Sequence, residues 1–565
     1  MAIYQQSPGV QVVEKDASAV TPGTSTTVGG YSGVFNWGPV MTPMLINNED
    51  ALVSIFGKPD NETFGSFFAA SNFLTYANSM WVNRVATTNK NASANGTGIL
   101  IKNLLEYETA FADGQGVAGA FAARYPSTLG NSIKVSIADS TTFATWEYKN
   151  QFQSAPGTSE FAASKAGSND EIHVIVIDQN GKFSGTPGST LEKFAFVSKG
   201  SDAVSYQGLS NYYANVIRNQ SQYIYWMDHA EITSNWGNEC ANTVFSTLTD
   251  TITAGYDFTY TLSGGTDDNA ATQGELETGW DLFKNIESYD ISLFPTGNAT
   301  SVLAKYVIDN VAEVRKDAVI FASLVSSSGG PVFSTSATKI TDAATFKTAM
   351  GNSTYAVFDS GYKYMYDKYN DKYRWVALNS DIAGLCAKVD VNQDTWQSPA
   401  GLTKGQIRGA IKLAWNPNQA ERDELYKLAI NPVVSFTGQG TLLYGDKTGT
   451  LKPSAFDRIN VRRLFLVLEK SIARSAKYQL FELNDAITRL QFVASVEPFL
   501  RDVQGRRGID QFRVICDETN NTGQVISTNE FRGTILIRPV YSINFITLTF
   551  TAVGPNVTFE TAAGV

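Results

Sequence analysis

The sequence predicts an α+β multidomain fold, with discontinuous α/β core domains built from both chain ends and an inserted, mostly β domain between them. Two observations support this prediction. With 565 residues, the chain is too long for a single hydrophobic core. Its patterning also changes along the chain, because helix-spaced apolar residues near both ends flank a long stretch of short, strand-like runs separated by turns.

Residues 1–22 are expected to form an extended N-terminal arm that is part of the core domain. The short β-type run Val10–Glu14 lies between two chain breaks, Pro8-Gly9 and Thr21-Pro22-Gly23. A run this short cannot bury its apolar side chains within itself. We therefore expect it to pair with a sheet, either in its own subunit or in a neighbour.

An α/β middle domain is expected from residues 23–86 together with residues 263–416. Helical and strand-like patterns alternate in both segments, and a strand–helix–strand unit of this length favours a right-handed parallel crossover. The simplest topology therefore joins both segments in one domain. The predicted helices cover 49–56, 64–78, 272–285 and 301–315, and the predicted strands cover 80–85, 290–294 and 317–322.

Residues 87–262 are predicted to be the inserted, mostly β domain. The insertion opens with small polar residues over 86–96, which we interpret as a linker. Strand-like runs follow at 133–137 and 171–177, and Asp178-Gln-Asn-Gly181 is typical of a tight hairpin turn.

Residues 417–565 are expected to form a C-terminal core domain that ends in a second strand arm. The predicted helices and strands of this domain cover 419–430, 441–444, 460–477, 511–516, 534–538 and 543–550. A terminal strand next to a flexible segment can add to the sheet edge of a neighbouring subunit, or it can close its own subunit's sheet. The sequence leaves both alternatives open for each end of the chain.

Composition excludes several classes of function. A net charge of -10 argues against direct nucleic-acid binding, which needs basic surface to displace counterions. The three cysteines, Cys240, Cys386 and Cys516, lie far apart, which indicates free, buried thiols in a reducing cytosol. The start of the chain has no signal-peptide pattern, and no apolar run is long enough for a membrane helix. We therefore expect a soluble protein made in a cytoplasm, with no membrane insertion.

One short stretch is typical of catalysis. Asp446-Lys-Thr-Gly-Thr-Leu451 matches the phosphorylation motif of P-type ATPases, whose aspartate attacks a phosphoryl group. Its context argues against that chemistry, because the membrane helices and the later acidic motif of those enzymes are missing. The alternative interpretation is a Gly-Asp turn whose Lys and Thr cap the next segment. With two isolated histidines and no phosphate-binding loop, we expect no catalytic, cofactor-binding or metal-binding residues.

The predicted helix near residue 460 is unusually basic for an acidic protein. Its basic side chains cannot all lie on one helix face at 100° per residue. They could form ion pairs within the subunit, or they could form a docking surface for an acidic partner. The residues concerned are Arg458, Arg462, Arg463, Lys470, Arg474 and Lys477.

Several motifs, in order along the chain, carry a resemblance to a known family. They include Phe35-Asn-Trp-Gly-Pro39, Trp81-Val-Asn-Arg-Val85, Ser380-Asp-Ile-Ala-Gly-Leu-Cys386, Ser398-Pro-Ala-Gly401 and Phe456-Asp-Arg-Ile-Asn-Val-Arg-Arg-Leu464. Together they resemble the contractile tail sheath proteins of T-even-like bacteriophages. The similarity covers residues 1–86 and 263–565, and the insertion looks shorter than in the T-even relative.

The resemblance implies a structural protein of the virion tail, assembled in the host cytoplasm without any cofactor. Such proteins polymerise with themselves as stacked hexameric rings around an inner tail tube, between a baseplate and a tail terminator. The helical sheath contracts from a metastable extended state and drives the tube through the host envelope. One alternative keeps the sheath function but places it in a phage-tail-like bacteriocin or a secretion system. A remote alternative is an aspartyl-phosphate enzyme that uses Asp446.

The resemblance also implies roles for particular residues. The two arms exchange strands with neighbouring subunits, which assigns that role to Val10, Gln11, Val12, Val13, Ile543, Phe545, Thr547 and Phe550. The core domain faces the tube, which makes the basic helix from Arg458 to Lys477 the candidate for tube contact.

Overall fold

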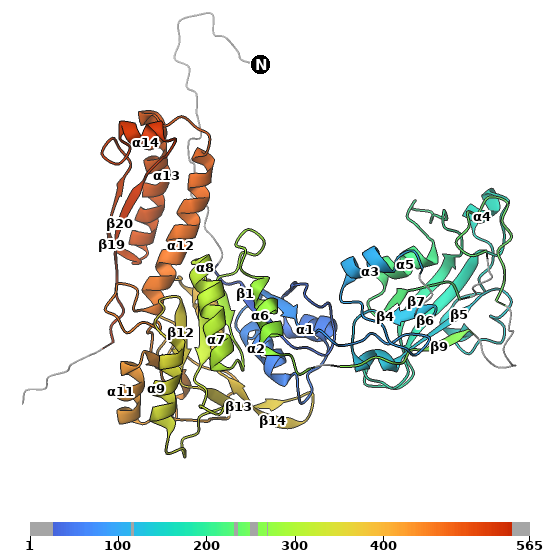
Figure 1. Ribbon diagram of the computed structural model, residues 1–565, viewed down its shortest axis with the longest axis horizontal. Coiled ribbons are helices and arrows are strands. Elements are labelled where there is room, and N and C mark those ends of the chain that lie inside the picture. Colours follow the sequence, from blue (N-terminus) through green and yellow to red (C-terminus); the bar gives the residue numbers. More distant parts are fainter. Residues whose placement is uncertain (1–25, 115–117, 231–234, 249–257, 268, 545–565) are drawn as a thin grey trace, which may run out of the picture.

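The computed structural model describes residues 26–114, 118–230, 235–248, 258–267 and 269–544. The N-terminal arm lies outside these residues, and so does the predicted C-terminal strand apart from Ile543 and Asn544. Figure 1 shows the elements from α3 to β9 gathered in a separate lobe, at a distance from all the others. We call residues 87–262 the inserted lobe and the remaining described residues the body.

A seven-stranded sheet forms the centre of the body. β1 pairs in parallel with β3 on one side and with β10 on the other, so the segments before and after the insertion share one sheet. Only β2 runs antiparallel. In sheet order the strands are β16 (Ile430–Asn431), β12 (Ala356–Asp359), β11 (Val319–Ser323), β10 (Leu293–Pro295), β1 (Gly29–Gly33), β3 (Met80–Arg84) and β2 (Met44–Ile46).

The sheet extends past the domain boundary expected after residue 416. β16 pairs with β12, and Leu425, Ile430, Val433 and Leu443 belong to the same hydrophobic core as the rest of the sheet. The physical reason is that β16 completes the edge of a parallel sheet whose strands are buried on both faces. The sheet and its core therefore include residues that we had assigned to the C-terminal domain.

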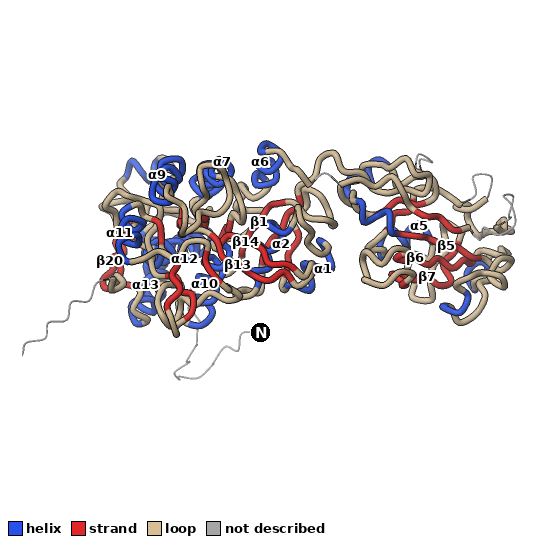
Figure 2. Tube along the Cα trace, turned by 90° about the horizontal axis from the view of Figure 1, so that it is seen from below, coloured by secondary structure: helices blue, strands red, loops and turns tan. Residues whose placement is uncertain are grey.

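Helices cover both faces of this sheet, as Figure 2 shows with α6, α7 and α9 on one side and α1, α2 and α10 on the other. Capping boxes at Thr272 with Glu275 and at Asn418 with Glu421 begin α6 and α11. The helical segments of this part are α1 (Glu49–Phe56), α2 (Phe64–Leu74), α6 (Gln273–Asp281), α7 (Ser301–Val307), the π-turn Ile308–Ala312, α8 (Glu313–Arg315), α9 (Lys339–Met350), α10 (Asn379–Asn392) and α11 (Gln419–Lys427).

Two small antiparallel sheets complete the body beside the large one. The first contains three strands, in the order β14, β13, β15, and the second is a two-stranded hairpin of β17 and β18. Their bounds are β13 (Tyr362–Asp367), β14 (Lys372–Ala377), β15 (Lys412–Leu413), β17 (Val433–Phe436) and β18 (Gly440–Leu443).

The inserted lobe is mostly β, with its own hydrophobic core around a four-stranded antiparallel sheet. Asp178 ends β6, and its carboxylate accepts hydrogen bonds from the backbone N–H groups of Lys182, Phe183 and Ser184 at 2.8–2.9 Å. The connection to β7 is therefore a longer, side-chain-ordered loop and not the predicted tight turn. The elements are α3 (Leu104–Ala110), β4 (Phe121–Ala123), η1 (Thr128–Ser132), β5 (Ile133–Ala138), η2 (Lys149–Gln151), α4 (Glu160–Ser164), β6 (Glu171–Asp178), β7 (Ser189–Ser198), α5 (Tyr213–Gln220), β8 (Ile224–Trp226) and β9 (Thr259–Thr261).

The predicted linker over residues 86–96 is wrong, because much of this segment is buried. The Asn91 side-chain amide donates to the carbonyls of Ile101 and Ala123 at 3.1 and 2.9 Å. Arg84, also buried, donates to the Pro126 carbonyl at 2.7 Å and so joins the large sheet to the inserted lobe. Small polar residues serve here to satisfy buried backbone groups rather than to provide a flexible connection.

The C-terminal part of the body is a helical hairpin that packs against a two-stranded sheet (Figure 1). Leu464 and Leu468 of α12 pack with Phe492, Val496 and Leu500 of α13, at the spacing of one helix face. Pro498 stands inside α13, a helix that we had not predicted. The elements are α12 (Ile459–Ala476), η4 (Lys477–Gln479), α13 (Ala486–Gly505), β19 (Ile509–Ile515), α14 (Gly523–Ser527) and β20 (Thr534–Pro539).

Three further findings bear on the excluded functions. All three cysteines are buried and free, which confirms the expectation of unpaired thiols. Across the described residues, no helix has both the length and the apolar character needed to cross a membrane. The same residues contain no group of acidic, histidine or cysteine side chains that could hold a metal ion.

Candidate functional site

The enzyme-like stretch after Gly445 is an extended segment, and the predicted Gly-Asp turn is wrong. Lys447 pairs with Arg458 in an antiparallel bridge, and the backbone N–H of Thr448 donates to the Asp457 carbonyl at 3.0 Å. The backbone N–H of Ile459, the first residue of α12, donates to the Asp446 carbonyl at 2.8 Å. The segment therefore supplies a partner to a helix N-terminus, whose first N–H groups have none within the helix.

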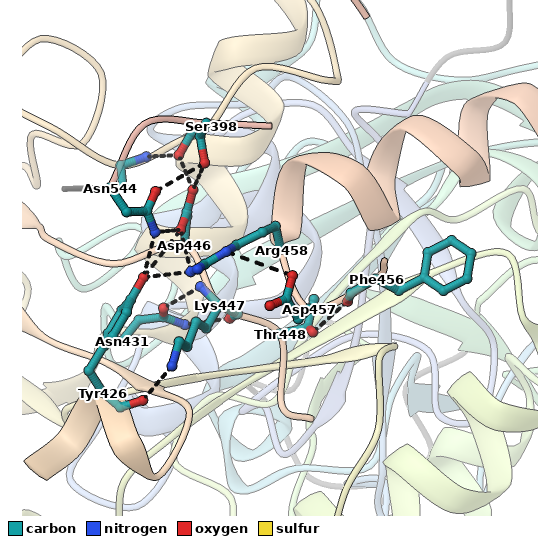
Figure 3. Close-up of polar contacts among 12 residues, drawn as sticks. Ser398, Tyr426, Asn431, Asp446, Lys447, Thr448, Phe456, Asp457, Arg458 and Asn544 are labelled. Atoms are coloured by element: carbon teal, nitrogen blue, oxygen red, sulfur yellow. Dashed lines mark hydrogen bonds and ion pairs between the residues drawn. The ribbon is translucent and has the colours of Figure 1, made fainter. Parts of the chain in front are cut away.

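The Asp446 carboxylate is the centre of a buried polar cluster, which Figure 3 shows. The residue is only 4% exposed, and both carboxylate oxygens accept hydrogen bonds. One oxygen faces three donors and the other faces two hydroxyls. The contacts are Tyr426 Oη at 3.4 Å, Arg458 Nη1 at 3.4 Å and Asn544 Nδ2 at 3.2 Å on Oδ1, and Ser542 Oγ at 2.6 Å and Ser398 Oγ at 3.2 Å on Oδ2.

Tyr426 connects this cluster to α11. Its hydroxyl accepts hydrogen bonds from Arg458 Nη1 at 2.8 Å and from Asn544 Nδ2 at 2.9 Å. Lys447 Nζ donates to the Tyr426 carbonyl at 2.8 Å and lies 4.2 Å from the centre of its ring. Burial raises the pKa of Tyr426 and lowers the pKa of Lys447. The cluster thus ties α11, the start of α12 and the beginning of the C-terminal arm together.

A second buried cluster lies one turn further along α12. Arg463 is 2% exposed, and its Nη2 lies 2.5 Å from Asp390 Oδ2, which belongs to α10. The same carboxylate oxygen accepts a hydrogen bond from Thr26 Oγ1 at 2.6 Å. The hydroxyls of Thr26 and Thr395 are also in hydrogen-bond contact, at 3.1 Å. Burial raises the pKa of Asp390, although the adjacent Arg463 guanidinium acts in the opposite direction.

The structure contradicts the predicted docking surface for two of the six basic residues. Arg462 and Arg463 are buried inside the subunit, because their positions face the sheet and α10 rather than solvent. The Arg462 guanidinium stacks 4.1 Å from the Tyr355 ring centre. The other interpretation, ion pairs within the subunit, fits Lys470, which lies 2.9 Å from Asp290, and Arg474, which lies 3.6 Å from the same residue.

Arg474 and Lys477, at the far end of the helix, are the two of the six that are exposed, whereas Arg458 and Lys470 are half-buried and hydrogen-bonded within the subunit. Ile543 is exposed and lies outside any strand, directly after Ser542 in the Asp446 cluster. The remaining predicted arm residues lie outside the described part of the chain.

Sequence reasoning missed the partners that give these clusters their role. Thr26, Asp390, Tyr426, Ser542 and Asn544 have no motif of their own, and they come from four distant segments. Ser542 directly precedes the strand predicted over 543–550, and Asn544 lies in it. Both clusters can hold chain segments in place, and neither offers an exposed nucleophile.

In this fold, two buried carboxylates hold distant chain segments at the base of one helix. Comparison with known proteins gives the family. Residues 271–449 match the phage tail sheath protein central domain, residues 451–552 match the phage tail sheath C-terminal domain, and residues 26–85 match the tail sheath protein Gp18 domain III N-terminal region. The chain belongs to the phage tail sheath protein family.

Full-length relatives support this assignment. The chain is 33% identical to the tail sheath protein of Vibrio phage KVP40 and 32% identical to that of Enterobacteria phage T4, covering 99% of this chain and of each relative. Among solved structures, the sheath tail proteins of Desulfitobacterium hafniense and Listeria innocua share the fold with a TM-score of 0.53 each. They are 10% and 11% identical, over 94% and 93% of this chain and 100% and 97% of theirs.

Proposed function

We propose that this chain is the structural subunit of a contractile phage tail sheath. In this proposal it polymerises as stacked hexameric rings around an inner tail tube, between the baseplate and the tail terminator. Contraction from a metastable extended state drives the tube through the host envelope. The full-length phage relatives support a phage over a secretion system or bacteriocin. The buried, fully engaged Asp446 carboxylate supports a role without catalysis or cofactor.

Self-assembly is supported above all by the exposed tip of the α12–α13 hairpin. Large apolar side chains that face solvent there belong to neighbouring turns and to the connecting loop. Large exposed apolar side chains concentrated in one short segment are typical of a protein–protein contact. The residues are Tyr478, Leu480, Phe481, Leu483, Ile487 and Leu490.

Strand exchange between subunits is the proposed role of the two arms. β19 and β20 form a two-stranded sheet, so each has an edge that pairs with no other strand among the described residues. An arm strand from a neighbour can use these backbone groups. For tube contact, the candidates that remain exposed are Arg474 and Lys477.

Deletion of residues 1–20 tests this proposal, because it removes the predicted strand Val10–Glu14 and leaves Thr26 in place. We expect a folded subunit that forms no long tubes in negative-stain electron microscopy. Deletion of residues 1–7 is the matched control, since it shortens the chain but keeps the strand, and its tubes should be normal. Normal tubes from the longer deletion would refute strand exchange through this arm.

A further inference from the structure

The two ends of the described chain are attached to the base of the same helix. Thr26 reaches α12 through Asp390 and Arg463. Ser542 and Asn544 reach it through Asp446 and the N-cap residue Arg458. At 1.5 Å per residue, the two arginines are separated by about 7.5 Å along the helix axis. The points at which the two arms leave the body, at Thr26 and Ser542, therefore lie close together, although they are separated by more than 500 positions in sequence.

Both attachments use the same chemistry. A hydroxyl from a residue beside the arm, Thr26 or Ser542, donates to a buried carboxylate at 2.6 Å, and an arginine of α12 or its N-cap lies against that carboxylate. Hydrogen bonds to an ionised acceptor are stronger than neutral ones, and burial excludes competing water. Each arm is thus anchored next to a short, directional contact to a buried carboxylate.

One short loop connects the two clusters. Thr395 contacts the Thr26 hydroxyl at 3.1 Å, and Ser398 donates to Asp446 at 3.2 Å. Between them, the Trp396 carbonyl accepts a hydrogen bond from Asn460 Nδ2, in the first turn of α12, at 3.3 Å. The loop from 395 to 398 and the first turn of α12 are therefore shared by both attachments.

We propose that these two clusters form one arm junction, which holds the starts of both arms in a fixed relation to each other. Arg458 and Arg463 are then positioning residues for the links between subunits, and not the tube contacts that the sequence suggested. A displacement of one arm passes to the other through the base of α12 and the 395–398 loop. This inference rests on the proposed function, in which the arms link neighbouring subunits.

The test removes the contacts on the arm and leaves the carboxylate with its body partners. In Ser542→Ala/Asn544→Ala, Asp446 keeps Arg458, Tyr426 and Ser398. Chymotryptic cleavage of the purified subunit after Tyr541 should become about tenfold faster or more, because the lost hydrogen bonds exceed the 1.4 kcal/mol that corresponds to tenfold and cleavage follows the population of the detached segment. The critical concentration for tube formation should rise by a similar factor, because the freed arm must be ordered on assembly.

Ser398→Ala is the matched control, because it removes a donor to the same Asp446 oxygen from the body side. It should leave cleavage after Tyr541 nearly unchanged. The claim that the clusters form one junction is tested by Thr26→Val, which should speed cleavage after Tyr541 several-fold although it alters only the other cluster. Unchanged cleavage there in Thr26→Val would overturn the single junction, and unchanged cleavage in the double variant would overturn the attachment itself.

These outcomes separate the inference from the function on which it rests. If the 1–20 deletion still forms normal tubes, the arm function fails and the inferred link between subunits fails with it, whatever the cleavage rate shows. If the deletion abolishes tubes but the double variant assembles and is cleaved like the unmodified chain, only the arm junction fails.

Discussion

Replacement of Arg463 by Met should destabilise the base of α12 strongly. The substitution keeps most of the side-chain volume but removes the guanidinium that lies 2.5 Å from Asp390. Because the pair is buried, Asp390 would be left as an uncompensated charge in the interior. Breaking a buried ion pair in this way costs about 3–5 kcal/mol. Amide exchange in the first turns of α12 should therefore accelerate by about two to four orders of magnitude.

The pH dependence of this loss has a definite sign. Burial already raises the pKa of Asp390 in the folded chain, and loss of Arg463 should raise it further. A carboxyl with a raised folded pKa binds its proton more readily in the folded state, so stability falls as the pH rises through the window above its unfolded pKa of about 4. The loss of stability that Arg463→Met causes relative to the unmodified chain should become smaller as the pH falls from 8 towards 5.

Exchange measured by mass spectrometry suits this chain because it reports on α12 locally, whereas a multidomain protein need not unfold in one step. Arg474→Met is the matched control, since Arg474 is exposed on the same helix and lies 3.6 Å from Asp290. Amide exchange in α12 should be nearly the same in Arg474→Met as in the unmodified chain. Arg463→Met/Asp390→Leu should recover part of the loss. Unchanged exchange in Arg463→Met, or a double variant that is less stable than the single one, would refute the reasoning.

Three further outcomes follow from the structure. Burial lowers the pKa of Lys347 to about 8. Between pH 8 and 10.5 only the unfolded chain keeps that proton, so the free energy of unfolding measured with urea should increase with pH over this range. Lys347→Met should show no such increase. Gly279→Val should lower the melting temperature, because even a Cβ at Gly279 would lie 2.4 Å from Val85 Cγ2, and overpacking costs about 1–3 kcal/mol; an unchanged melting temperature would contradict this packing. Replacing residues 88–267, the inserted lobe with the segment that pairs with its beginning, by a short linker should leave a folded body, because the large sheet has a core without residues of the lobe. Aggregation in gel filtration would count against that division.

Local signals explain why parts of the fold could be predicted from the sequence. α1 begins and ends where expected, since the Asn48 side chain accepts a hydrogen bond from Ala51 N and Gly57 follows the last turn with a positive φ of 77°. The capping boxes of α6 and α11 are likewise local. Such patterns depend on residues three or four positions apart, so they can be recognised without tertiary structure.

The errors arose where distant contacts decide the outcome. Pro498 is a helix breaker in isolation, yet it is accommodated inside the 20-residue α13. Arg462 and Arg463 are charged residues that normally lie at the surface, but a ring from residue 355 and a carboxylate from residue 390 cover them. The sequence pattern identified the basic helix correctly and could not show which way its arginines point.

The most direct test is a cryo-electron microscopy structure of tubes assembled from the full chain. The account predicts strands at residues 10–13 and 543–550 that pair with the β19–β20 sheet of neighbouring subunits. It also predicts that the contacts of Thr26 with Asp390 and of Ser542 with Asp446 persist in the polymer. Tubes in which both arms fold back on their own subunit, or in which neighbours meet without either arm, would contradict the account.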